Sequence, residues 1–416
     1  GGRLTAISDR DGNSLTIAVD SAVRKTVTDR PGKTYALDYN ADGLLVKVTD
    51  YIGRSVAYGY DASKNLTRFT DVLGRNTYYQ YNADKQLTAI VDPRGTTAVT
   101  VSYDTDGGAK YVTDAVGNQT EFRLIDVNGT PGVAVVRPVV NNVNTNSIYL
   151  RDDSGRVTAE ITAENYGDYK TSRSFREVIS VDAIGDKGLV ASKTNPRNFI
   201  TNYQYSTDGR GNRTAVANAK AETTTYGYKT EDDYGPQGQA NRTNLNVLDK
   251  VTTPLNNIWE MDHTDNGHLS SIITPKGGRT AIDYTGEGLV SQVTDPRGNA
   301  SSFSYNSAGM LAEQYDAAGG SAYTYDSLNR KVEAVDRRGV ITKYTYDAAG
   351  HILTVTRAFG LAEETTVTKA YDANGNLVSV TDGRGNTRSF TYNGNNQKVS
   401  ATYTISGTSY TRHYEY

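Results

Sequence analysis

Short runs of alternating apolar and polar residues cover most of this chain, and a turn signal separates each run from the next. In one such unit, Leu44, Val46 and Val48 alternate with their neighbours, and residues 56–60 alternate in the same way. A period of two is typical of a β-strand. The turn signals between these runs leave no room for a helix. Each unit therefore predicts two short strands and two tight turns.

The first of the two turns, which we name the Asp turn, starts with an aspartate that is followed three residues later by a glycine. The pattern occurs as Asp50 with Gly53, Asp71 with Gly74, Asp92 with Gly95 and Asp295 with Gly298, and Gly339 and Gly385 occupy the same turn position. Aspartate favours the first position because its carboxylate caps nearby backbone N–H groups. Glycine suits the fourth because it accepts a positive φ without steric cost.

A tyrosine precedes the second turn, which we name the Tyr turn, and returns about every 21 residues. The tyrosines of this set are Tyr39, Tyr60, Tyr81, Tyr305, Tyr325, Tyr346, Tyr371 and Tyr392. Four residues after them, glycine or asparagine dominates, and Lys64 and Lys85 are the departures. This preference predicts a left-handed backbone position. A fixed period predicts an array of identical supersecondary units.

Aromatic residues also occur two positions apart, as in Phe303 with Tyr305 and Tyr344 with Tyr346. Side chains at this spacing share one face of a strand, so stacked repeats would form aromatic ladders. The chain has 31 Tyr against 7 Phe and 1 Trp, a bias that suits half-wet packing. We interpret the ladder as packing, and a sugar- or ligand-binding ladder is the alternative.

The whole chain, residues 1–416, is predicted to be a single repeat array. Repeats are regular in 1–123 and 270–416, and the centre, 124–269, is degenerate. Within the centre we expect a longer hairpin after residue 124, surviving turns at Tyr149–Gly155 and Tyr205–Gly209, and an inserted surface loop at 229–246. His263 occupies a tyrosine slot, since His263 to Gly267 matches Tyr39 to Gly43. The predicted fold is all-β: one continuous, curved antiparallel sheet.

Composition excludes several classes of function. The net charge is only −3 and no basic block occurs, which argues against a nucleic-acid partner. No run approaches the roughly 18 apolar residues of a membrane-spanning helix. Cysteine is absent, so disulfides, a thiol nucleophile and a Cys-ligated zinc are excluded. The chain starts abruptly inside a repeat, so we expect its termini to be those of a fragment.

Candidate chemistry is sparse, and we expect no enzymatic activity. The four histidines lie in different repeats, and His263 and His268 have no metal spacing. Two Asp-rich turns, residues 9–13 and 104–108, faintly resemble calcium loops but lack the later bidentate glutamate. We expect no cofactor, with calcium at these turns as the alternative. The GRGN segments are not phosphate loops, because no helix follows them.

Several of the motifs resemble the YD repeat of Rhs proteins. They are YDAAG (346–350), YDANG (371–375), TDPRGN (294–299), TDGRGN (381–386) and TDVLGR (70–75). Wall-associated YD-repeat proteins, the B and C components of insecticidal toxin complexes and the teneurins share this repeat. The resemblance implies a β-sheet that spirals into a hollow shell. Bacterial members often enclose a toxic C-terminal domain and release it by self-cleavage. The shell-sealing region and the self-cleaving aspartyl motif are not recognisable in this chain.

Two functions follow from the resemblance. The first is the wall of a bacterial shell that encapsulates a C-terminal toxin for secretion or contact-dependent competition. The second is an extracellular structural filament, tube or adhesion scaffold without a toxin. Both place the protein outside the cell or at its surface, with a polypeptide cargo or further repeats of the same chain as partners. A two-strand repeat advances a sheet by roughly 10 Å, and its open edges allow self-assembly. A glycoside-binding or glycoside-cleaving solenoid is a third, lower-ranked hypothesis.

Overall fold

The computed structural model describes residues 4–8, 14–29, 32–127, 129–138, 146–151, 157–162, 175–181, 190–194, 199–207, 211–229 and 247–414. These residues form β-strands and turns, with no helix among them. The described part of the chain therefore has no helix long and apolar enough to cross a membrane. The all-β class predicted from the two-residue period is confirmed.

The strands belong to two compact units. Unit 1 comprises Gly1–Leu37 and Arg176–Gly320, and unit 2 comprises Asp38–Phe175 and Ser321–Tyr416. The dividing points fall inside β4 (Thr34–Tyr39), β16 (Phe175–Val181) and β28 (Gly319–Tyr325). The prediction that residues 1–416 form a single array remains a prediction.

Unit 1 holds fourteen further strands. They are β1 (Ala6–Ser8), β2 (Ser14–Ser21), β3 (Arg24–Thr28), β17 (Val190–Thr194), β18 (Ile200–Tyr205), β19 (Arg213–Ala217), β20 (Thr223–Tyr228), β21 (Leu248–Thr252), β22 (Ile258–His263), β23 (Leu269–Ile273), β24 (Arg279–Tyr284), β25 (Val290–Thr294), β26 (Ala300–Tyr305) and β27 (Leu311–Asp316), all within the described residues.

Unit 2 has two runs of strands, which we name the first run (residues 38–138) and the second run (residues 321–414). The first run contains β5 (Leu45–Thr49), β6 (Ser55–Tyr60), β7 (Leu66–Thr70), β8 (Asn76–Tyr81), β9 (Leu87–Val91), β10 (Thr97–Tyr103), β11 (Ala109–Asp114), β12 (Gln119–Val127) and β13 (Thr130–Val136); β14 (Ser147–Arg151) and β15 (Val157–Thr162) follow it. The second run contains β29 (Lys331–Val335), β30 (Ile341–Tyr346), β31 (Ile352–Arg357), β32 (Thr365–Tyr371), β33 (Leu377–Thr381), β34 (Thr387–Tyr392), β35 (Lys398–Ile405) and β36 (Thr408–His413).

Strands that follow one another in the chain pair antiparallel in both units, as two-strand repeats require. In the first run, β6 pairs with β5 through Val56 and Val48, and with β7 through Tyr58 and Phe69. The register shifts between Gly59 and Tyr60, and the same shift recurs before the repeat tyrosine of β8, β26 and β34. Each of these tyrosines therefore lies at a β-bulge, where the strand bends into the Tyr turn.

The sheet has little dry core. In β26, Phe303 and Tyr305 are half-buried, whereas Ser302 and Ser304 are exposed. Among the residues that the structure describes, the buried hydrophobic side chains are Ala89, Ala134, Ile148, Ala215 and Ala401. Backbone ladders and half-covered aromatic rings thus provide most of the packing, which agrees with the bias toward tyrosine.

The degenerate centre keeps the hairpin pattern where it is described. The longer hairpin or strand pair predicted after residue 124 is present, since β12 and β13 pair from Glu121 with Val136 to Val127 with Thr130. β20 and β21 pair directly, and the N–H of Lys229 donates to Val247 O (3.1 Å), so the insertion joins two neighbouring strands. Residues 230–246 themselves lie outside the described residues. The turns predicted at Tyr149–Gly155 and Tyr205–Gly209 also lie partly outside them.

Candidate functional site: the turns of the repeat

The Asp turn is held by its own carboxylate, as its sequence predicts. In the first of these turns, Oδ1 of Asp50 accepts hydrogen bonds from the N–H groups of Ile52 (3.1 Å) and Arg54 (2.8 Å). The N–H of Gly53 donates to Asp50 O at 3.0 Å, and the φ of Gly53 is +86°. The positive φ predicted at this glycine is confirmed.

The second carboxylate oxygen of the Asp turn has a partner that the sequence reasoning missed. Arg54 Nε donates to Asp50 Oδ2 (2.7 Å), and Asn299 Nδ2 donates to Asp295 Oδ2 (2.8 Å). Hydrogen bonds from the side chain and backbone of Asn299 hold the pKa of Asp295 below its usual value. The sequence signal for this bond is an arginine or asparagine four residues after the aspartate, as in Arg54 and Asn299.

The Tyr turn repeats this geometry at the other end of the repeat. Oδ1 of Asp61, the residue after Tyr60, accepts the N–H of Asn65 (2.9 Å), and Oδ2 accepts its side-chain N–H (2.9 Å). The fourth residue after each repeat tyrosine is left-handed in every case that the sequence singled out, lysine included. These residues are Gly43, Lys64, Lys85, Gly107, Gly309, Asn329, Gly350, Gly375 and Asn396.

The hydroxyl groups explain why the repeat uses tyrosine and not phenylalanine. Tyr60 donates to Leu45 O (2.8 Å), and Tyr346 donates to Lys331 O (2.6 Å). The same bond, to a backbone carbonyl 15 to 19 residues earlier, is made by Tyr103, Tyr228, Tyr284, Tyr305, Tyr371 and Tyr392. Burial raises the pKa of Tyr60 above its ordinary value. Because these hydroxyls already donate to backbone carbonyls of the sheet, the structure favours packing over ligand binding as the role of the aromatic ladder.

His263 occupies a tyrosine slot, as predicted, but lacks the tyrosine's bond. It ends β22 at the same register shift as the repeat tyrosines. Its Nδ1 is buried and has no hydrogen-bond partner among the described residues. Burial lowers the pKa of this imidazole below that of a free histidine, and the charge of Lys229 acts in the same direction. His268, which has no metal spacing to His263, packs edge-on against the Tyr284 ring, with 4.8 Å between the ring centroids.

In the one calcium-like turn that the structure describes, the aspartate carboxylate accepts backbone hydrogen bonds. Oδ1 of Asp104 accepts the N–H groups of Asp106 (3.0 Å) and Gly108 (2.7 Å), as in the other turns. The related turn with Asp9 and Asp11 lies outside the described residues. Across the described ranges, no group of three or more His, Cys, Asp or Glu residues is arranged to hold a metal ion.

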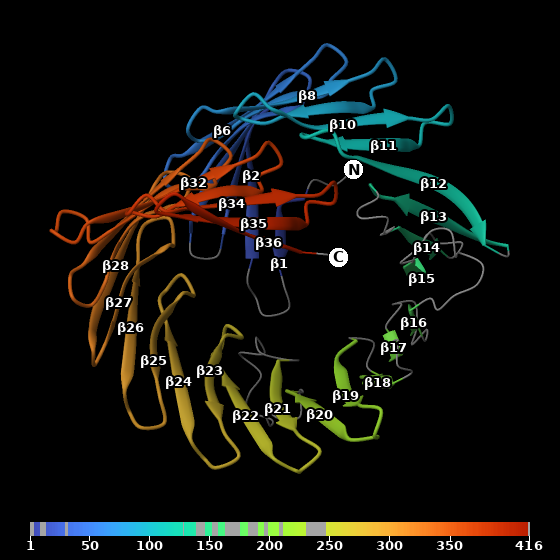
Figure 1. The fold of residues 1–416 in the computed structure, drawn as a ribbon. Helices are drawn as coiled ribbons and strands as arrows, with labels where there is room; N and C mark the ends of the chain where they lie inside the picture. The colour runs from blue at the N-terminus through green and yellow to red at the C-terminus, as the bar shows by residue number, and fades with distance from the viewer. Residues whose placement is uncertain are drawn as a thin grey trace. The chain divides into compact units, whose positions relative to one another are not determined.

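In unit 2, Asp turns of the first run contact Tyr turns of the second run. Arg54 Nη1 donates to Ser327 O (3.0 Å) and Asn329 Oδ1 (2.6 Å), and Arg94 Nη2 donates to Ala373 O (2.9 Å). These partners are 273 to 279 residues apart in the chain. Figure 1 shows β6 and β10, which follow these Asp turns, and β32, which precedes the Tyr turn with Ala373.

Two asparagines make the contact in the opposite direction. Asn374 Nδ2 donates to Asp114 Oδ2 (2.6 Å), and Asn395 Nδ2 donates to Pro138 O (3.2 Å). Both asparagines are in Tyr turns of the second run. The two runs of unit 2 are therefore joined turn to turn over several repeats.

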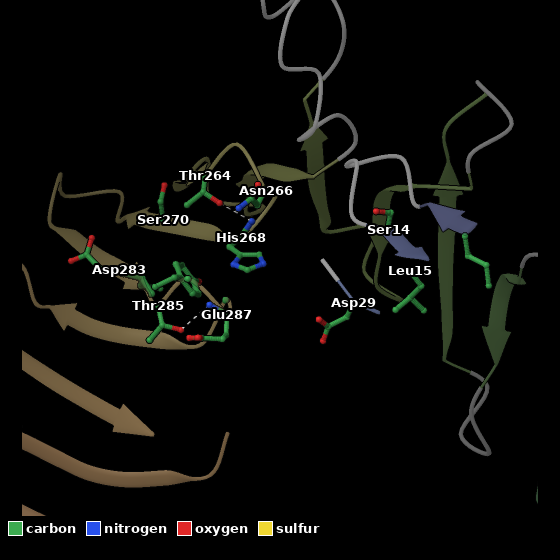
Figure 2. Close-up of a pocket in the computed structure, with 15 residues that line it drawn as sticks. Ser14, Leu15, Asp29, Thr264, Asn266, His268, Ser270, Asp283, Thr285 and Glu287 are labelled. Carbon is green, nitrogen blue, oxygen red and sulfur yellow. Dashed lines mark hydrogen bonds between the residues drawn. The ribbon is translucent and has the colours of Figure 1, made fainter. Parts of the chain in front are cut away.

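Unit 1 contains a hollow of about 810 Å³ between β1–β3 and the strands β22–β24. Figure 2 shows His268, Asp29, Leu15 and Glu287 around it. Its polar lining includes strand residues such as Ser270 and Asp283 and turn residues such as Thr264, whose Oγ1 accepts the N–H of His268 (3.2 Å).

The fold and the turns define a protein built of two-strand β-repeats with Asp- and Tyr-headed turns. The RHS Repeat family matches residues 39–75, 60–97, 284–321, 305–341, 325–362 and 371–416. No curated protein is similar enough in sequence to count as a relative. The chain therefore carries RHS repeats over residues 39–97, 284–362 and 371–416, as the YD motifs predicted.

Solved structures share the fold. A crystal structure of TcdB2-TccC3-Cdc42 is similar with a TM-score of 0.62 and 14% identity, over 97% of this chain and 26% of that one. A crystal structure of TcdB2-TccC3 has a TM-score of 0.56 and 14% identity, over 97% and 25%. This chain spans about a quarter of those chains. The predicted all-β fold of antiparallel two-strand repeats is confirmed, and these structures share it.

Proposed function

We propose that this chain is part of the non-enzymatic wall of a bacterial YD-repeat shell that encloses a polypeptide cargo, a toxin made from the same gene. The shell would act outside the cell or at its surface, in secretion or contact-dependent competition. The RHS repeats and the likeness to TcdB2-TccC3 support the shell-like role.

One observation carries the proposal. The two runs of unit 2 are bonded turn to turn, through Arg54, Arg94, Asn374 and Asn395. A ribbon of repeats whose distant parts are bonded along their edges can form a continuous wall. Such a wall can separate a lumen from solvent, whereas a free ribbon cannot.

The absence of enzymatic activity is also part of the proposal. The carboxylates of the Asp and Tyr turns accept two or three hydrogen bonds each, as at Asp50 and Asp61. Groups used in this way are poorly placed to act as general acids or bases, because their lone pairs already accept hydrogen bonds from the turn.

Protease protection tests the enclosed cargo. The protein is isolated from its source and digested with and without denaturant, and the surviving peptides are identified by mass spectrometry. We expect a polypeptide other than the repeat array to resist digestion until denaturant opens the wall. Digestion of all polypeptides at one rate in buffer would rule out enclosure.

A second candidate is an extracellular structural or adhesive scaffold that carries no toxin. It is favoured by the exposure of a turn edge of unit 2, where the side chain of Arg338 is 83% exposed. In the protease experiment, a scaffold would yield only fragments of the repeat array.

A further inference from the structure

The third residue of a repeat turn makes several of the contacts between the two runs of unit 2, beside those of Arg54, which follows its turn glycine. Arg94 is the third residue of the Asp turn that starts at Asp92. Asn374 and Asn395 hold the same position in Tyr turns that start at Asp372 and Asn393. All three side chains reach across to the other run.

Each run has two edges, because its strands connect Asp turns at one end to Tyr turns at the other. The Asp-turn edge of the first run faces the Tyr-turn edge of the second run. Two edges therefore remain outside this interface, namely the Tyr-turn edge of the first run and the Asp-turn edge of the second run. Strands of about six residues separate the two edges of a run by roughly 20 Å.

The third turn position carries opposite charges on these two outer edges. On the Tyr-turn edge of the first run it is Asp42 and Asp84, both exposed, with the uncharged Ser63 in the turn between them. Asp42 Oδ1 lies 3.1 Å from Nζ of Lys64 on the same edge, an exposed ion pair that a docking arginine would have to share or displace. On the Asp-turn edge of the second run it is Arg338 and Arg384, also exposed. Within the described residues, the side chain of Arg338 bonds only to its own turn, where Nη2 donates to Asp336 Oδ2 (3.3 Å). Arg94, by contrast, donates to the carbonyl of Ala373 in the other run.

The spacing of the charges also matches. Asp42 and Asp84 are two repeats apart on their edge, and Arg338 and Arg384 are two repeats apart on theirs. Two repeats advance a sheet by roughly 20 Å. In the existing interface the repeats of the two runs follow the same direction, since Arg54 meets the turn at Ser327 and Arg94 the later turn at Ala373.

We infer that a second copy of this chain docks its first-run Tyr-turn edge against the second-run Asp-turn edge of unit 2, with Arg338 facing Asp42 and Arg384 facing Asp84. The contact continues the chemistry of the interface between the runs, with the same turn position and the same direction of repeats. Because the two docking edges differ, the association is head to tail and each added copy leaves a new edge open. This inference does not depend on a cargo.

Charge reversal tests it, with the 416-residue chain followed by sedimentation velocity over a wide range of concentrations. We expect the unmodified chain to associate in low salt and to dissociate at about 1 M salt, where charges are screened within about 3 Å. The double variants Arg338→Glu/Arg384→Glu and Asp42→Lys/Asp84→Lys should each associate at least about tenfold more weakly, because like charges then face each other.

Mixing the two double variants should restore association, since each new lysine then meets a new glutamate. Lys47→Glu, an exposed reversal in the middle of β5, is the matched control and should associate like the unmodified chain. Circular dichroism checks that all variants keep their sheet. A chain that stays monomeric at every concentration, or variants that do not recover on mixing, would overturn the inference.

Discussion

Replacing His263 by tyrosine should stabilise the protein, because it restores the residue that the repeat uses at this position. His263 ends β22 as Tyr284 ends β24, and both lie at a register shift. The hydroxyl of Tyr284 donates to the carbonyl oxygen of Leu269, 15 residues earlier (2.7 Å). The corresponding carbonyl for position 263 is that of Leu248, the first residue of β21. We expect the introduced hydroxyl to donate to it.

Two contributions set the size of the effect. A new hydrogen bond of this kind stabilises by about 0.5–1.5 kcal/mol. The substitution also removes the buried, unpaired Nδ1 of His263, and such a group costs about 1–3 kcal/mol when it is fully desolvated. Because the His263 ring is only partly buried, the lower part of the second range applies. We expect a net gain of about 1–3 kcal/mol in the free energy of unfolding.

The gain should grow as the pH falls. Burial lowers the pKa of His263 in the folded protein, so the unfolded chain, with a histidine pKa of about 6.5, binds the proton more readily. Stability is therefore lost as the pH falls from the unfolded value toward the lower folded value. His263→Tyr lacks this loss, so the two proteins should differ more at about pH 5.5 than at about pH 7.5.

Urea denaturation followed by circular dichroism measures both effects. His413→Tyr, a change at an exposed position of β36, is the matched control and should stay within about 0.5 kcal/mol of the unmodified protein. If His263→Tyr is no more stable than the unmodified protein, or if the difference does not widen in acid, the equivalence of His263 and the repeat tyrosines is refuted.

The other predictions concern one turn glycine, one tyrosine and one contact between the runs. Gly53→Val should lower the free energy of unfolding by about 1–3 kcal/mol, because valine is strained at a φ of +86°. Gly53→Asn should lower it less, since asparagine takes this position in other repeats. Equal urea midpoints for both variants would contradict the left-handed turn. Tyr346→Ala should lower the free energy of unfolding by about 3 kcal/mol, and Tyr346→Phe by about 1 kcal/mol through loss of the bond to Lys331 O. If calorimetry finds the alanine variant as stable as the unmodified protein, the ring is free to bind a ligand. Arg94→Ala should speed hydrogen exchange in the turn of residues 372–375, because Arg94 binds the carbonyls of Asp372 and Ala373. Unchanged exchange there would show that the contact does not hold the runs together.

Local chemistry made the repeat predictable from sequence. The strand over residues 45–49 follows from its alternation, and the turn at Asp50 and Gly53 follows from the carboxylate and the missing Cβ. The left-handed position was predicted correctly even at Lys64, where a lysine replaces the usual glycine or asparagine, because the period of the tyrosines locates the turn. The φ of Lys64 is 68°. Each of these features depends only on residues a few positions apart.

Contacts between strands and between runs were not predictable in the same way. The carbonyl that receives the Tyr346 hydroxyl belongs to another strand, so it depends on the register and bulge of the sheet. The contact of Arg94 with Ala373 joins residues 279 apart and depends on how the sheet curves. The curvature of the sheet cannot be read from a single sequence. The repeats could be found from their period, but which repeats meet could not.

Cryo-electron microscopy of the protein isolated from its source tests the central claim most directly. The claim is that turn-to-turn bonding of YD repeats builds a wall around a polypeptide. We predict particles whose walls show the two-strand repeat and whose lumen holds additional polypeptide density. Open-ended filaments with an empty, solvent-filled lumen would contradict the claim and leave the scaffold as the function.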